Sequence, residues 1–331
     1  MSMITEYDSL LLDLDGTIWE GGRSIDDAVD AIIGAGLPVV YVTNNASRAP
    51  GVVAEQLRGI GLDSATADDV MTSAQAAVIM ASEKIPAGSP VYILGTDSFR
   101  DLARDAGFEV VDSADDRPVA VLHGHNPATG WAQLSEAALS IHNGALYFAS
   151  NLDTTLPMER GLHVGNGSMV AAVVSATGVT PEAAGKPGPA MFFKAAEQLA
   201  SARPLVVGDR LDTDIAGGNA AGMDTFQVLT GVSGHYALLT AAPGQRPDFI
   251  ADTLADLTAD AGALRPGPQG GFTARVEGEE VVLDGGDDSS TPTQALRTAL
   301  AAAWAVEESA VPVTRVRAAS TAATTALEAW W

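Results

Sequence analysis

Short apolar runs alternate with amphipathic stretches along the first part of the chain. Residues 9–12 and 37–42 are apolar runs that stop at polar turns, which is typical of buried strands. Apolar residues recur with helical spacing over 26–36 and 50–61. A strand followed by a helix, repeated, predicts a parallel sheet with crossover helices.

Two further stretches repeat this alternation. Strands are predicted at 91–95, 109–111, 119–123 and 145–149, with helices at 97–106 and 131–143. The first pattern then resumes with a helix to residue 202, strands at 204–208 and 225–229, a helix at 214–222, and short pieces at 249–250 and 254–257. We therefore expect an α/β fold in which one α/β unit, residues 84–179, interrupts another, residues 1–83 and 180–258.

The last part of the chain predicts a small additional domain. Glycine and proline dominate residues 262–271 (GALRPGPQGG), a composition typical of linkers. The segments predicted after it are a hairpin at 272–283, a helix at 293–307, a strand at 313–317 and a helix at 321–331. This pattern indicates a linker at 259–271 and a C-terminal α+β domain at 272–331.

Composition narrows the functional classes. With 18 Lys and Arg against 42 Asp and Glu, the chain has a net charge of −24, which disfavours nucleic acid and anionic membranes as partners. The absence of cysteine excludes disulfides, zinc–thiolate sites and thiol nucleophiles. No apolar run reaches the roughly 18 residues that span a bilayer. Residues 1–8 show no secretory signal, so we expect a cytoplasmic protein.

Acidic residues gather at two predicted strand ends. Asp13 and Asp15 follow the first strand, and two acids at this spacing suit a nucleophile and a general acid–base. Asp209, Asp212 and Asp214 follow a later strand, and carboxylates crowded this closely suit a Mg²⁺ ion. Solvated acidic loops would give the same patterns in so acidic a chain, so both interpretations stay open.

Two other places carry groups that suit an anion. Thr43 and Asn44 end the second strand before a helix, where hydroxyl, amide and backbone N–H groups bind phosphate. An ordinary helix cap is the alternative there. Lys186 is one of only three lysines and precedes a helix that opens with prolines. A plain surface lysine is the alternative at that position.

In their order along the chain, the segments DLDGT, VTNN, GKP and GDRLDTD resemble the four motifs of the haloacid dehalogenase superfamily of phosphohydrolases. The resemblance covers about residues 8–258. Only 28 positions separate Asp15 from Thr43, whereas 143 separate Thr43 from Lys186. The resemblance therefore implies a Rossmann-like core with a C2-type α/β cap inserted between the second and third motifs. DLDGTIWEGG, TNNASR, GNGSMVAAVVSATG and GKPGPAMF resemble the NagD-like, p-nitrophenyl phosphatase and phosphoglycolate phosphatase branch.

This resemblance implies a Mg²⁺-dependent phosphatase acting on small phosphate monoesters, with glycerol 3-phosphate expected first and 2-phosphoglycolate second. Asp13 would form an aspartyl-phosphate, while Asp15 would serve as general acid and then as base. The implied phosphate-binding residues are Thr43, Asn44 and Lys186, which is also a catalytic residue. The implied metal site is formed by Asp13, the Asp15 backbone carbonyl, Asp209 and, behind them, Asp214.

Substrate selection is expected from the cap, with Asn151, Asp153 and Arg160 as candidate contacts, although ordinary turn residues would look the same. The stretch His123-Gly124-His125-Asn126 departs from the family's apolar-Gly-apolar-Asp, which weakens any contact carried over to Asn126.

The tail faintly resembles part of an acetyltransferase (GNAT) fold. Because residues 275–280 lack the final small residue of the pyrophosphate loop, we interpret the tail as a packing or oligomerisation module. A homodimer through the cap or the C-terminal domain is the expected form of assembly.

A different functional class stays open. A catalytically silent relative would bind a small phosphorylated metabolite and act as a sensor. The four intact motifs weigh against this alternative, because a sensor has no need of both Asp13 and Asp15.

Overall fold

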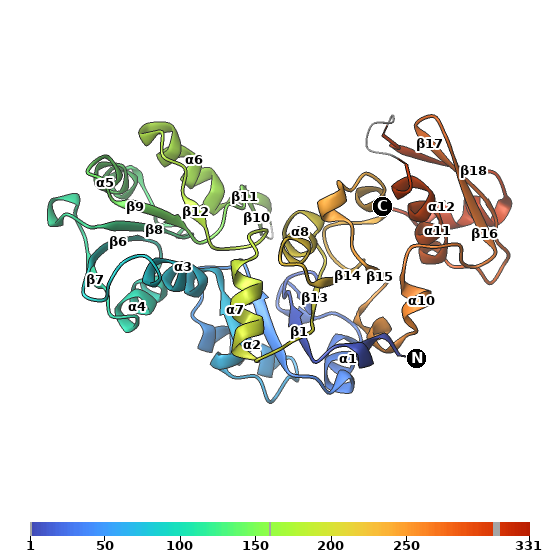
Figure 1. Ribbon diagram of the computed structural model, residues 1–331, viewed down its shortest axis with the longest axis horizontal. Coiled ribbons are helices and arrows are strands. Elements are labelled where there is room, and N and C mark those ends of the chain that lie inside the picture. The colour runs from blue at the N-terminus through green and yellow to red at the C-terminus, as the bar shows by residue number, and fades with distance from the viewer. Residues whose placement is uncertain (1, 159, 307–311) are drawn as a thin grey trace. The chain divides into compact units, whose positions relative to one another are not determined.

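The computed structural model describes residues 2–158, 160–306 and 312–331. The chain forms two compact units, each of which contains parallel strands (Figure 1). The first unit comprises Met1–Val40, Ile60–Leu62 and Ala196–Trp331, and the second comprises Tyr41–Gly59 and Asp63–Ala195. Over the residues described, no helix combines the length and apolar character needed to cross a bilayer.

The larger sheet has six strands in the order β15-β14-β13-β1-β4-β5. Its strands are β1 (Ser9–Leu12), β4 (Val39–Thr43), β5 (Val70–Thr72), β13 (Pro204–Gly208), β14 (Asp224–Val228) and β15 (Phe249–Ala251). β1 pairs in parallel with β13, and Leu11 lies opposite Val206. β1 (SLLL) and β13 (PLVVG) are buried on both faces, so their residues are mostly apolar rather than alternating. From β1 the chain continues to β4 and β5 on one side of the sheet, whereas β13, β14 and β15 are added on the other side. β1 therefore lies where the strand order reverses, and ligands bind at the carboxyl ends of strands at such a point.

Short helices and one small hairpin complete the core part of the first unit. They are α1 (Ala28–Ala35), α8 (Ala216–Ala220), α9 (His235–Leu239), α10 (Ala261–Leu264) and the hairpin of β2 (Trp19–Glu20) and β3 (Arg23–Ser24). α1 ends at Gly36, whose φ of 63° is the left-handed conformation that favours glycine. The helix predicted at 214–222 is instead a π-helical turn, Leu211–Ile215, followed by the shorter α8.

Within the first unit, the tail (residues 272–331) packs against the rest of the unit in a shared apolar core. It contains β16 (Phe272–Glu277), β17 (Glu280–Gly285), β18 (Arg315–Ala318), α11 (Pro292–Trp304) and α12 (Thr321–Glu328). Leu296 and Leu300 of α11 share one buried cluster with Leu211 and Leu238 of the core. α11 ends at Trp304, earlier than the helix predicted at 293–307, and Glu307 lies outside the described residues.

The second unit is built on a five-stranded sheet with the order β12-β9-β8-β6-β7. Its strands are β6 (Pro90–Leu94), β7 (Glu109–Val111), β8 (Ala120–His123), β9 (Leu146–Ala149) and β12 (Glu182–Ala183). The other elements of this part of the chain are α2 (Pro50–Gly59), α3 (Ser73–Ser82), α4 (Asp97–Asp105), α5 (Trp131–His142), α6 (Asn166–Thr177), α7 (Ala190–Gln198) and the hairpin of β10 (Thr155–Met158) and β11 (Gly161–Val164).

Several of these elements are absent from the sequence prediction, and α3 shows why. Six of its ten residues are buried, so apolar and small residues occur all around the helix and leave no amphipathic period. A local signal was nevertheless present. Thr72 accepts a hydrogen bond from the backbone N–H of Gln75, whose side chain accepts one from the backbone N–H of Thr72. This reciprocal cap marks a helix start.

Replacing Leu296 by Ala is expected to lower the free energy of unfolding by about 2–5 kcal/mol, because the substitution removes buried volume from the cluster that tail and core share. The matched control is Leu139→Ala on α5, since the Leu139 side chain is 51% exposed. That control should change the free energy of unfolding by less than about 0.5 kcal/mol. Urea titrations measure both, and equal midpoints for the two variants would contradict the prediction.

A buried histidine predicts a pH dependence of stability. His123 of β8 is buried, its Nδ1 lies 2.9 Å from the Tyr147 hydroxyl, and desolvation lowers its pKa from 6.5 to about 3. Between these two values the unfolded chain binds more protons, so this contribution to stability is complete above about pH 6.5 and falls as the pH falls. His123→Gln is expected to flatten the acid limb of the unfolding free energy, whereas His142→Gln, at an exposed position, is expected to leave it unchanged. Identical acid limbs for the wild type and His123→Gln would contradict this prediction.

Candidate active site

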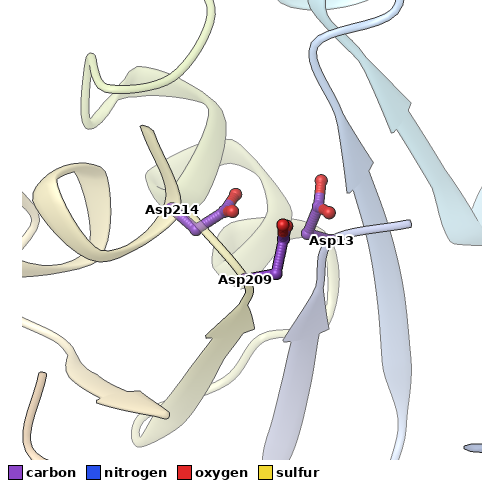
Figure 2. Close-up of side chains that lie close together, drawn as sticks. All are labelled: Asp13, Asp209 and Asp214. Atoms are coloured by element: carbon purple, nitrogen blue, oxygen red, sulfur yellow. The ribbon is translucent and has the colours of Figure 1, made fainter. Parts of the chain in front are cut away.

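Three carboxylates from separate parts of the sequence meet at the ends of two neighbouring strands. Asp13 follows β1, Asp209 follows β13, and Asp214 lies in the π-helical turn after Asp209 (Figure 2). One oxygen atom of each lies within 4.8 Å of the others, and Asp209 and Asp214 are buried. The structure thus brings together three of the four acids that the sequence assigned to a metal site.

The Asp209 carboxylate is held by close backbone on several sides. Its Oδ2 accepts a hydrogen bond of 2.5 Å from the backbone N–H of Val232. A Cβ atom built on Gly16 would lie 2.6 Å from this oxygen, and one built on Gly231 would lie 2.0 Å from it. Gly16 also has a φ of +89°, so both space and backbone conformation require glycine there.

The π-helical turn separates the roles of its two acids. The Asp214 Oδ2 accepts the backbone N–H of Arg210 at 3.1 Å, and a Cβ atom on Gly208 would lie 2.3 Å from the Cβ atom of Asp214. Asp212, whose role the sequence left open, is exposed instead and forms an ion pair of 2.9 Å with Arg210. Asp212 is therefore not one of the three gathered carboxylates.

The two acids of the first strand end also differ. The Thr17 hydroxyl donates to Asp13 Oδ2 at 3.4 Å. Asp15 lies outside the group of three carboxylates, and its Oδ1 accepts the indole N–H of the buried Trp19 at 2.8 Å. A charged acceptor bound by a fixed ring nitrogen has a defined orientation, so Trp19 orients the side chain predicted as the general acid.

In the second unit, Asn44 and Lys186 hold each other. The Asn44 Oδ1 accepts the backbone N–H of Lys186 at 2.9 Å, and the Asn44 Nδ2 donates to the Lys186 carbonyl at 3.0 Å. The Lys186 side chain is buried, and its Nζ donates to the Val42 carbonyl at 3.0 Å. Thr43 is buried as well, and its hydroxyl accepts the backbone N–H of Asn45. A cation in so dry a position is little screened by water and acts strongly on nearby negative charge.

Two of the three predicted cap residues join this network. Asp153 accepts hydrogen bonds of 3.1 and 3.2 Å from the Asn44 Nδ2, and the Asn151 Nδ2 donates to the Asn44 carbonyl at 2.8 Å. Asn44 is therefore a structural hub, and its amide hydrogens already have acceptors among these residues. Arg160 is exposed and lies between β10 and β11, whereas the adjacent Glu159 lies outside the described residues.

The donor set of the first unit fits a divalent cation. Two unit charges about 4 Å apart repel by about 4 kcal/mol at an effective dielectric constant of about 20. Three carboxylates at the separations found here therefore favour either a proton or a cation among them. Carboxylate oxygens alone, with no sulfur or imidazole donor in the group, suit Mg²⁺ rather than a softer metal.

Sequence reasoning missed the residues that position these acids. Trp19, Gly231, Val232 and Gln227 were not singled out, although the Gln227 Nε2 donates to the Asp209 carbonyl at 2.7 Å. The run Gly231-Val232-Ser233-Gly234 follows a predicted strand and is a turn signal. A turn signal does not show that the turn contacts Asp209, so the sequence offered no way to assign it a role.

Comparison with known proteins agrees with this geometry. Residues 10–109 match the family described as haloacid dehalogenase-like hydrolase, and residues 183–257 match an HAD-hydrolase-like family. Residues 269–330 match a GCN5-related N-acetyltransferase like domain.

Similar proteins of other organisms are phosphatases. D-glycerol 3-phosphate phosphatase of Mycobacterium tuberculosis is 40% identical, over 99% of this chain and 95% of its own length. An acid sugar phosphatase of Staphylococcus aureus is 39% identical over 69% of this chain and 88% of its own length.

Solved structures give the same picture. The glycerol phosphate phosphatase of M. tuberculosis in complex with magnesium has a TM-score of 0.93 and 41% identity, and the match covers 100% of this chain and 98% of that one. A p-nitrophenyl phosphatase from Archaeoglobus fulgidus has a TM-score of 0.70 and 27% identity, over 76% of this chain and 98% of that one. The expected family, α/β fold and phosphatase class are confirmed. The chain belongs to the haloacid dehalogenase-like hydrolases, among the p-nitrophenyl phosphatase-type enzymes that its four motifs resemble.

Proposed function

We propose that this phosphatase hydrolyses glycerol 3-phosphate with Mg²⁺, through an aspartyl-phosphate on Asp13. The observation that carries the proposal is the 40% identity to D-glycerol 3-phosphate phosphatase over 99% of the chain. The gathered carboxylates of Asp13, Asp209 and Asp214 support the metal requirement.

The proposed reaction has two displacements at phosphorus. An Asp13 carboxylate oxygen bonds to phosphorus while the bond from phosphorus to the glycerol oxygen breaks, and Asp15 gives its proton to that oxygen. Asp15 then takes a proton from water, whose oxygen bonds to phosphorus as the Asp13–phosphorus bond breaks. This returns Asp13 as a carboxylate and Asp15 as an acid, and phosphate leaves.

Electrostatic stabilisation supplies most of the rate acceleration in phosphoryl transfer. Mg²⁺ held by Asp13, the Asp15 backbone carbonyl and Asp209, with Asp214 behind them, supplies positive charge to the phosphoryl oxygens when bound. Lys186 adds its ammonium charge and Thr43 its hydroxyl. Asn44 contributes less directly than the sequence suggested, because its side chain fixes the Lys186 backbone on both sides.

Selection of the substrate is assigned to residues of the second unit. Asp153 is positioned through Asn44 and carries a carboxylate of the kind that binds hydroxyls. Asn151 is buried, and its amide bonds to Asn44 and Asp153, so its proposed contribution is to hold Asp153 in place. Arg160 is exposed and carries a charge suited to a second anionic group. The predicted domain boundaries (1–83 with 180–258, 84–179, 259–271 and 272–331), the cytoplasmic location and a homodimer remain predictions that accompany this proposal.

A panel of phosphate monoesters tests the proposed substrate. With Mg²⁺, glycerol 3-phosphate is expected to give a kcat/KM at least about tenfold above that of 2-phosphoglycolate, a difference of about 1.4 kcal/mol in transition-state binding. Excess chelator is expected to abolish turnover, because it removes the cation that offsets the negative charge of the phosphoryl group. Added Mg²⁺ is expected to restore turnover. Preference for 2-phosphoglycolate would overturn the substrate. No turnover of any ester, p-nitrophenyl phosphate included, would favour the sensor alternative.

Substitution of the proposed nucleophile tests the chemistry. Asp13→Asn is expected to lower kcat by about 10³-fold or more, because an amide forms no acyl-phosphate with the substrate. Asp212→Asn is the matched control, since it makes the same change at an acid of the GDRLDTD segment that is exposed and paired with Arg210. Its kcat is expected within about twofold of the wild type. Stopped assays on p-nitrophenyl phosphate, with circular dichroism to verify folding, decide the point, and an active Asp13→Asn enzyme would refute the assignment.

A further inference from the structure

A five-residue loop, Thr230–Gly234, connects the acidic site of the first unit with the end of the tail. The Thr230 hydroxyl donates to the Gly16 carbonyl at 2.6 Å. Val232 donates its backbone N–H to the Asp209 carboxylate, and Ser233 donates its backbone N–H to the Asp209 carbonyl at 3.1 Å. This side of the loop therefore contacts both acidic strand ends.

The other side of the same loop lies against the tail. A Cβ atom built on Gly234 would lie 2.5 Å from both Cε3 and the carbonyl oxygen of Trp331. The backbone N–H of Tyr236, two residues further, donates to that carbonyl oxygen at 3.3 Å. Gly234 thus permits a contact between loop and tail that no larger residue would allow.

Trp330 anchors this contact. Its side chain is buried and stacks on His235, with ring centroids 5.4 Å apart and an interplanar angle of 19°. The indole N–H donates to the carbonyl of Pro292, the first residue of α11, at 3.2 Å. The Tyr236 ring meets Trp330 edge-on. The tail helix, Trp330 and residues 234–236 therefore form one packed unit, and Trp331 contacts Gly234 and the edge of His235 while its own surface is 51% exposed.

Two further hydrogen bonds join the loop to the framework beneath the carboxylates. The Ser233 hydroxyl accepts the backbone N–H of Leu211 at 3.1 Å, at the start of the π-helical turn that carries Asp214. The buried Gln227 donates from Nε2 to the carbonyls of both Asp209 and Ser233. A shift of residues 233–234 would consequently change the positions of Asp209 and Asp214.

We infer that the tail is a positioning element for the metal site: the packing of Trp331 on Gly234 fixes the loop whose Val232 N–H orients the Asp209 carboxylate. The domain that matches an acetyltransferase-like family then serves the phosphatase reaction. This inference rests on the proposed role of Asp209 in holding Mg²⁺. Trp331 is a positioning residue and takes no part in the chemistry.

The test measures Mg²⁺ binding itself, by calorimetric titration of the chelator-treated full chain with MgCl₂ and no substrate. Trp331→Ala is expected to raise the Kd for Mg²⁺ about tenfold, the lower end of the effect of residues that orient metal ligands. Trp331→Phe keeps a ring on Gly234 and is expected to stay within about twofold of the wild type. The matched control is Trp131→Ala, because Trp131 is the most exposed tryptophan of those described, at 84%, and its Kd is expected to be unchanged.

A reciprocal variant keeps the test decisive if Trp331→Ala does not fold. Gly234→Ala places a methyl group where Trp331 lies, leaves the tail sequence intact, and is expected to raise the Kd for Mg²⁺ to a similar extent. Purely structural packing would instead lower Tm and leave the Kd unchanged in both folded variants, and that result would overturn the inference. If the wild type itself binds no Mg²⁺, the proposed metal site fails rather than its coupling to the tail.

Discussion

Mutual repulsion among three carboxylates is the constraint on which the rest of the first unit depends. Asp13, Asp209 and Asp214 are gathered at strand ends with two of them buried, which is unfavourable for the fold unless positive charge is bound there. Much of the surrounding structure exists to keep these side chains in place. Glycines allow backbone to approach them, and backbone N–H groups of Val232 and Arg210 hold individual oxygens.

The second unit solves a different problem, which is the placement of a buried lysine. Lys186 is bound through both its backbone N–H and its carbonyl to one side chain, that of Asn44. Asn44 also bonds Asp153, and its backbone carbonyl accepts from Asn151. One amide thus ties together motifs that lie more than a hundred residues apart in the chain, and its loss would disturb several binding groups at once.

The sequence was most informative where a physical requirement is local. The apolar run ending at Leu12, the acids after it and the strand before Asp209 were all identified, because burial and strand-end chemistry leave their mark in adjacent residues. α3 escaped because a helix buried all round has no polar face to reveal its period.

The positioning residues escaped for another reason. The partner of Asn44 is Asp153, 109 residues further along the chain, and such a pairing depends on tertiary structure that no periodicity encodes. Trp19 lies only four residues from Asp15, but neither residue lies in a predicted helix or strand whose period would have paired them. Asp212 illustrates the converse, since it shares its local sequence with Asp209 and Asp214, yet the π-helical turn points it toward Arg210.

The shared apolar cluster has a consequence for how this architecture is inherited. Leu211 and Leu238 of the core are buried in a cluster that Leu296 and Leu300 of the tail complete. A relative without the tail would expose Leu211 and Leu238 to water, so loss of the tail and the residues at these two positions are expected to change together. Polar substitution at the core positions is then a mark, readable in sequence alone, of a phosphatase that has dispensed with the appended domain.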